Sequence, residues 1–152
     1  MIRFNIDTQI DRPVPEVFAF ATDLDRLPEW QTNAVSAVLE ADGPLGVGSR
    51  VREVRRVPGG KRIELLVEVV EYQPSTAFAM NVIEGTPLHM RMTFEPHGQG
   101  TAMRFAVHGQ LPGLLRVVDP LFAIVVKRQF AKQCAELKRV LEQSPPASSP
   151  AG

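Results

Sequence analysis

The chain has 152 residues, of which 44% are hydrophobic and 22% are charged, as expected for a single globular domain. Its Lys and Arg residues number 17 and its Asp and Glu residues also number 17, so global charge gives no reason to expect nucleic acid or an anionic membrane as a partner. A single cysteine, Cys134, excludes an intrachain disulfide and a multi-cysteine zinc site.

Targeting and membrane-spanning signals are missing from the sequence. The N-terminal stretch alternates polar and apolar residues without the apolar core of a secretory signal. The longest strongly apolar run, residues 121–126, is far too short to span a bilayer, so we expect no integral membrane segment and a cytoplasmic location. Residues 144–152 are rich in Pro and Ser, which predicts a disordered tail after a domain of residues 1–143.

The first elements are a strand and two short helices. Apolar residues recur at period two over 2–10, which predicts a strand. Helical spacing over 11–22 predicts a helix with Asp11 as a candidate N-cap. The stretch "DLDRLPEW" (23–30) begins again with a cap residue, Asp23, and ends on the only tryptophan, Trp30.

The rest of the chain predicts a meander of strands and then one long helix. Period-two segments separated by turn signals cover 34–40, 50–57, 61–73, 76–83, 88–96 and 101–110. Asp119 before Pro120 predicts a helix start, and an apolar stripe then continues to Gln143. The expected fold class is therefore α+β: a curved seven-stranded antiparallel sheet wrapped around a long C-terminal helix, with two short helices after the first strand.

The stretch "IDRPVPEVFAFATDLDRLPEW" (10–30) resembles the start of the START-like, or Bet v 1-like, helix-grip superfamily (SRPBCC). It looks most like the bacterial polyketide cyclase/dehydrase-like and lipid-transport-like branch, and the resemblance covers about residues 2–143. It implies an internal cavity with Trp30 packed at one end. It does not choose a function, because the superfamily holds carriers, receptors, enzymes and chaperone activators.

Strand alternation predicts which side chains line that cavity. Only one face of the sheet can be buried, so the apolar members of each strand should face the long helix. The unbranched methionines among them would conform to varied apolar shapes, whether they fill a closed core or line a cavity. The predicted cavity residues are Trp30, Leu65, Val67, Phe78, Met80, Met90, Met92, Met103, Phe105 and Phe130.

The resemblance to the helix-grip fold implies that the glycine- and proline-rich turns (41–49, 84–87 and 110–116) gather at one rim near the start of the long helix, so an entrance is expected there. Its candidate residues are Leu45, Gly85, Leu114 and Leu115.

Polar strand residues are expected on the opposite, outer face of the sheet, where they would form a charged ladder. A bulge would turn some of them inward and make catalysis possible. These residues are Glu64, Glu68, His89, Arg91, Arg104 and His108. Cys134 lies at a helical core position, and no metal-ligand spacing or nucleotide motif occurs, so we expect no catalytic residue, no metal and no cofactor.

Three functions remain open from the sequence. The favoured one is binding or transport of a small hydrophobic ligand (a lipid, isoprenoid or polyketide-like molecule) by a monomer or homodimer. The second is a polyketide cyclase/dehydratase-like enzyme, which would need an inward-facing polar group. The third is a chaperone-activator-like interaction module, which would need an exposed apolar patch on the outer face.

Overall fold

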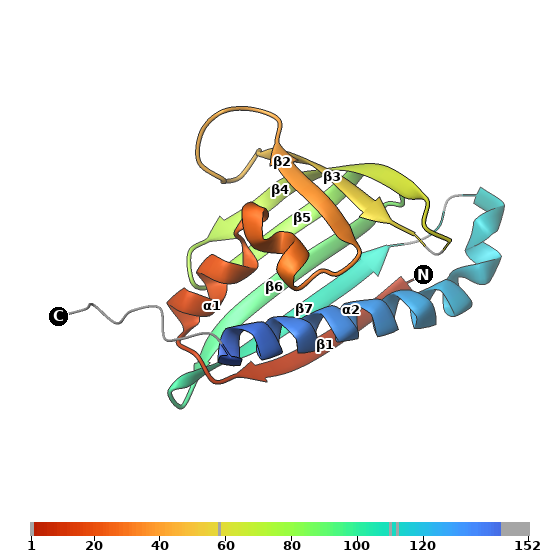
Figure 1. The fold of residues 1–152 in the computed structure, drawn as a ribbon. Helices are drawn as coiled ribbons and strands as arrows, with labels where there is room; N and C mark the ends of the chain where they lie inside the picture. The colour runs from red at the N-terminus through yellow and green to blue at the C-terminus, as the bar shows by residue number, and fades with distance from the viewer. Residues whose placement is uncertain (1, 58, 110, 112, 144–152) are drawn as a thin grey trace.

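One sheet and one long helix make up most of the molecule (Figure 1). The computed structural model describes residues 2–57, 59–109, 111 and 113–143, so the predicted tail lies outside the described residues. The elements are β1 (Ile2–Ile10), α1 (Val14–Ala21), the 3₁₀ helix η1 (Leu24–Glu29), β2 (Ala34–Leu39), β3 (Arg50–Arg56), β4 (Arg62–Gln73), β5 (Ala77–Glu84), β6 (Leu88–His97), β7 (Gly100–Gly109), the 3₁₀ helix η2 (Gly113–Val118) and α2 (Asp119–Gln143).

The sheet is antiparallel throughout, with strand order β1-β7-β6-β5-β4-β3-β2. The expected α+β helix-grip architecture is thus confirmed. Because every strand reverses direction, the sheet has two ends. We call the end where β1 begins and β7 runs on toward η2 the η2 end, and the end where β1 leads into α1 the α1 end. In Figure 1 the N-terminus marks the η2 end, beside the first turns of α2.

The first helix starts later than the sequence predicts. Asp11 does not cap α1; its backbone N–H donates to the Glu142 carboxylate at 2.8 Å, and the helix begins at Val14. The reason is Pro13, because the residue before a proline is pushed out of the helical region. The second predicted cap is confirmed, since the Asp23 carboxylate accepts a hydrogen bond from the Asp25 N–H at 3.0 Å.

Helix α2 lies across the β1 and β7 side of the concave face, as Figure 1 shows. Phe130 joins the two layers: its ring centroid is 6.0 Å from that of Phe4 and 5.0 Å from that of Phe105. Further along the helix, Leu137 is fully buried. The buried residues of α2 recur at spacings of seven, four and three positions, which is the pattern of a helix that covers a core with one face.

Helix α1 fills the α1 end of the concave face. Its Phe18 ring packs edge-on against Phe94 (5.3 Å between centroids) and Tyr72 (5.6 Å). Phe94, Met92 and Phe78 are buried there. Aromatic edge-to-face contacts of this kind add to the area that they remove from water. This half of the sheet therefore has a packed interior.

The start of α2 is tied to the chain before η2. The buried Asp119 carboxylate accepts a hydrogen bond from the backbone N–H of Leu111 at 3.0 Å, so the chain between them leaves and returns at nearly the same place. None of the described helices is both long and apolar enough to cross a membrane.

We expect Leu137→Ala to lower the free energy of unfolding by about 2–5 kcal/mol, because it leaves a cavity under α2. Urea denaturation measures the change. Leu121→Ala is the matched control on the same helix; Leu121 is 66% exposed, so its truncation should change stability little. Similar losses for the two variants would contradict the packing described for α2.

Candidate ligand-binding site

Strand pairing decides which side chains face α2. Met80 lies opposite Met90, and Met90 lies opposite Val107, which in turn lies opposite Phe4. Directly opposed residues of antiparallel strands point to the same face. The pairing from β5 through β6 and β7 to β1 contains no bulge, so the predicted apolar face is the concave one across all four strands.

The concave face is packed in one half and reached by solvent in the other. At the α1 end its residues are buried under α1, whereas toward the η2 end apolar inner residues stay half-buried. Helix α2 packs mainly on β1, with Phe130 reaching Phe105 of β7, and leaves the central strands less covered there. We call this region the open half. It is formed by Leu65, Met80, Val82, Leu88 and Met90 of the sheet and by Phe122 and Phe130 of α2.

The ten predicted cavity residues divide between these two halves. Leu65, Met80, Met90 and Phe130 belong to the open half. The other six are buried in the core: Trp30, Val67, Phe78, Met92, Met103 and Phe105. Trp30 ends η1 and is fully buried, as expected of a residue that anchors this turn to the core.

The four predicted entrance residues do not meet at one rim. Leu114 and Leu115 lie on η2, and Gly85 follows β5 at the same end of the sheet. Leu45 lies beyond β2, at the α1 end, in a surface pocket of about 320 Å³ with Leu24 and Leu39. Gly85 has a φ of +129°, and a Cβ there would stand 2.4 Å from the Leu65 side chain, so this turn needs glycine.

The six polar strand residues considered for catalysis lie on the outer face. Arg91 pairs with Glu71 at 2.7 Å, Arg104 with Asp7 at 2.8 Å and Glu68 with Arg50 at 3.3 Å. The remaining three are Glu64, His89 and His108. None of the six points into the open half.

The two outer-face histidines stack on each other. The His89 ring lies 4.8 Å from the His108 ring, and its Nδ1 is 2.6 Å from the Asn81 side-chain oxygen. Burial lowers the pKa of His89, and His108 and Arg91 lower it further. His89 thus belongs to the outer-face ladder rather than to the open half.

A buried polar cluster stands on the inner face of β3, where the sequence did not predict one. Glu53 lies opposite Leu65, and Arg55 lies opposite Ile63, so both point toward the helix side. Arg55 Nε donates to Glu53 Oε1 at 2.8 Å, and its Nη1 donates to Asn33 Oδ1 at 3.0 Å. The Glu53 side chain is only 4% exposed and that of Arg55 16%.

Helix α2 completes this polar cluster through Gln133. The Gln133 amide nitrogen donates to Asn33 Oδ1 at 2.9 Å, and Gln31 Oε1 accepts from Arg55 Nη2. Gln133 Oε1 is buried and has no hydrogen-bond partner among the described residues, and the same is true of Trp30 Nε1. Buried polar atoms in proteins are nearly always paired, so an orphaned acceptor marks a place where a ligand or water atom fits.

Sequence reasoning missed this cluster because β3 reads "RVREVRR" and has no purely apolar face. The available signal was the hairpin itself. The short 57–61 turn joins β3 to β4, so it pairs Val51 with Val67 and Glu53 with Leu65, on the apolar face of β4.

Cys134 is a buried residue of α2. Burial raises the pKa of the Cys134 thiol to about 12, so the thiol stays protonated and behaves as a small apolar side chain. Within the described part of the chain, no three His, Cys, Asp or Glu residues are grouped closely enough to hold a metal ion.

Comparison with known proteins places the chain in a family. Residues 1–142 match the model of the family described as polyketide cyclase / dehydrase and lipid transport. The chain belongs to this family. The family match confirms the predicted resemblance to the polyketide cyclase/dehydrase-like and lipid-transport-like branch. A search of curated protein sequences finds no match.

Several solved structures share the fold of this family member, although their sequence identity to it is low. TTHA0849 from Thermus thermophilus is 21% identical with a TM-score of 0.77, over 93% of this chain and 99% of the other. Ara h 8.0201 is 16% identical with a TM-score of 0.73, over 93% and 98%. The di-domain ARO/CYC BexL, from the BE-7585A biosynthetic pathway, is 16% identical with a TM-score of 0.78, over 93% of this chain and 47% of BexL. These likenesses establish the fold.

We expect Arg55→Met to lower the free energy of unfolding by about 3–5 kcal/mol, because it leaves the Glu53 carboxylate buried without its partner. Replacing both residues, by Glu53→Leu with Arg55→Met, should recover most of the loss. Urea denaturation of the two variants measures both effects. Arg104→Met is the control, since the Arg104–Asp7 pair is exposed and its loss should leave stability nearly unchanged. If Arg55→Met caused no loss of stability, the burial of the Glu53–Arg55 pair would be contradicted. A large loss of stability from Arg104→Met would contradict the exposure of the Arg104–Asp7 pair.

Proposed function

We propose that this protein binds and carries a small hydrophobic ligand, of the lipid, isoprenoid or polyketide-like class, in the open half of its concave face. The observation that carries the proposal is the half-buried apolar wall formed by Met80, Met90 and Phe130 with their neighbours. A wall of apolar side chains that solvent still reaches gains free energy when a ligand displaces that solvent. The methionines let the wall adapt to ligands of different outline.

The polar cluster supports a ligand with one polar end. Arg55 and Glu53 are next to Leu65 across the β3–β4 pair, so they border the open half. Gln133 Oε1 is an acceptor without a partner among the described residues, so a ligand hydroxyl that reaches it would satisfy it. We therefore favour an apolar body with a terminal hydroxyl or enol over a pure hydrocarbon.

Binding is tested with a neutral fluorescent probe, N-phenyl-1-naphthylamine, and by native mass spectrometry of gently purified protein. Met90→Glu should weaken probe binding at least about tenfold, because it buries a carboxylate in the apolar wall. Val38→Glu is the matched control, since Val38 is 60% exposed and lies outside the open half. The proposal fails if the wild-type protein takes up neither the probe nor a copurifying ligand, or if both variants behave alike.

A second function, a polyketide cyclase/dehydratase-like enzyme, is favoured by one observation: Glu53 and Arg55 are ionisable residues on the inner face. In such a reaction the Glu53 carboxylate would take a proton from the carbon between two carbonyl groups. The electron pair would move onto a carbonyl oxygen, whose charge Arg55 would stabilise. BexL is described as a di-domain ARO/CYC, which agrees with this chemistry on the same fold.

Glu53→Gln separates the two functions. A carrier should keep ligand affinity within a few-fold in this variant, since the side-chain volume is conserved and the apolar wall is untouched. An enzyme that uses Glu53 as a base should lose at least about a hundredfold of its turnover of a poly-β-ketone thioester. Product analysis by mass spectrometry measures this. A wild-type protein with no turnover would rule out the enzyme.

The compartment and the oligomeric state complete the proposal. We expect a cytoplasmic protein that works as a monomer or homodimer. We expect no nucleic acid partner, because the chain is neutral overall. The interaction-module alternative needs an apolar patch on the outer face of the sheet. The large exposed apolar residues instead gather mainly on η2 and the start of α2.

A further inference from the structure

Among the described residues, seven of the ten large apolar residues that are exposed lie on η2 and the first two turns of α2. Leu114 is 90% exposed, Val117 is 83% exposed and Leu121 is 66% exposed. We call this surface the apolar tip; its other members are Leu115, Val118, Ile124 and Val125. Seven large apolar side chains exposed on two successive helices are unusual for a monomer and point to an interaction surface.

Cations follow the apolar tip directly along α2. Residues 120–135 contain three cations, Lys127, Arg128 and Lys132, and no acidic residue. All three side chains are exposed. On the helix, Arg128 follows Val125 by three residues and Leu121 by seven, and Lys132 follows Val125 by seven, so the same outward face changes from apolar to cationic.

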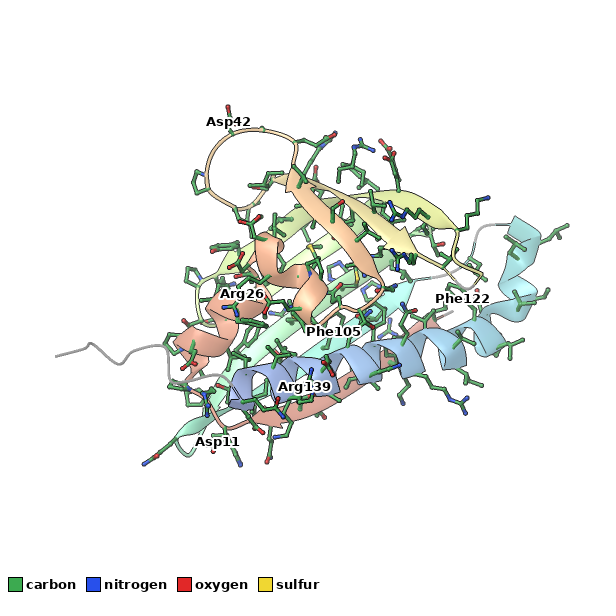
Figure 2. All side chains as sticks on the ribbon, in the orientation of Figure 1. Asp11, Arg26, Asp42, Phe105, Phe122 and Arg139 are labelled. Atoms are coloured by element: carbon green, nitrogen blue, oxygen red, sulfur yellow. The ribbon has the colours of Figure 1, made fainter. Side chains whose placement is uncertain are left out.

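The neighbouring hairpin adds further cations at the same end. The turn between β3 and β4 lies at the η2 end (Figure 1) and is flanked by the exposed Arg56, Lys61 and Arg62. Asp11 and Asp42 lie away from this end (Figure 2), whereas Glu84 is exposed at it. The neutral net charge of the chain is therefore compatible with a local group of cations beside the apolar tip.

We propose that the apolar tip docks on the surface of an anionic lipid bilayer. An anionic surface attracts the cations, and the apolar side chains enter the boundary between headgroups and acyl chains. The spacing fits: Arg128 lies about 10 Å along the helix from Leu121, at a rise of 1.5 Å per residue. When α2 stands end-on to the bilayer with Leu121 about 5–10 Å deep, Arg128 and Lys127 lie near the level of the phosphates.

A second copy of the chain fits this surface less well. In a symmetric dimer the same patch meets itself, so Arg128 and Lys127 of each copy would approach those of the other. Like charges placed together oppose such an association, and the buried centres of protein interfaces are depleted of charge. The same cations favour a bilayer that carries negative headgroups.

Cosedimentation with vesicles tests the docking, using phosphatidylcholine alone and phosphatidylcholine mixed with phosphatidylglycerol. The wild-type protein should bind the mixed vesicles, bind phosphatidylcholine poorly, and lose binding as salt increases. Replacing two apolar residues, by Leu114→Ser with Val117→Ser, should weaken binding at least about tenfold. Replacing Lys127 and Arg128 by Gln should weaken it about fivefold for each cation.

The matched control is Val38→Ser with Val47→Ser, which removes two exposed valines away from the apolar tip and should leave vesicle binding unchanged. Equal binding to both vesicle types, or undiminished binding of the tip variant, would overturn the proposal. So would a wild-type dimer, measured by analytical ultracentrifugation, that the tip variant dissociates while neither protein binds vesicles. Met90→Glu, which disables the proposed ligand site, should bind the mixed vesicles like the wild-type protein, so failure of docking is distinct from failure of the proposed ligand binding.

Discussion

Regular pairing from β1 through β7 and β6 to β5 is the constraint on which the other features depend. A slip of one residue would turn Met90 and Phe105 to solvent and bring His89 and Arg104 under the helix. The absence of a bulge in these strand pairs keeps each side chain on its face. The apolar concave wall and the outer ladder of ion pairs are thus two consequences of the same hydrogen-bond pattern.

The concave face of the sheet is larger than the area that one long helix can cover. Helix α2 packs on β1 and reaches β7 through the Phe130 ring, and α1 with Phe18 fills the space near Phe94 at the α1 end. Toward the η2 end, Met80 and Met90 pack against the core but remain half-buried. The open half therefore arises from how two helices of unequal length divide one curved sheet. Its nearness to η2 places the proposed ligand site and the apolar tip at the same end.

Most of the fold could be predicted from the sequence, because alternation and turn signals are local and strong in β4 to β7. The polar cluster could not be found that way, since Glu53 and Arg55 lie in a strand whose own pattern favours neither face. Only its pairing with β4, which is a contact between segments, turns them inward. The position of Leu45 could have been predicted by counting strands. Three antiparallel strands separate its loop from the turn at Gly85, so the loop and the turn must lie at opposite ends of the sheet.

Net charge does not report how charges are distributed over a surface. A balance of 17 cations and 17 anions is compatible with a local group of cations, as at Lys61 and Arg128. Composition carries no information about position, and the exposure of Leu114 depends on which segments leave the core. These features needed coordinates.

The hydrogen bond from Leu111 to Asp119 has a consequence for how this protein could diversify. This hydrogen bond holds together the two ends of the segment that carries η2, so residues 113–118 could change in sequence while the start of α2 stays in place. Related chains could differ in these residues, and so in the surface on which they dock, without a change in α2 or in the sheet that α2 covers.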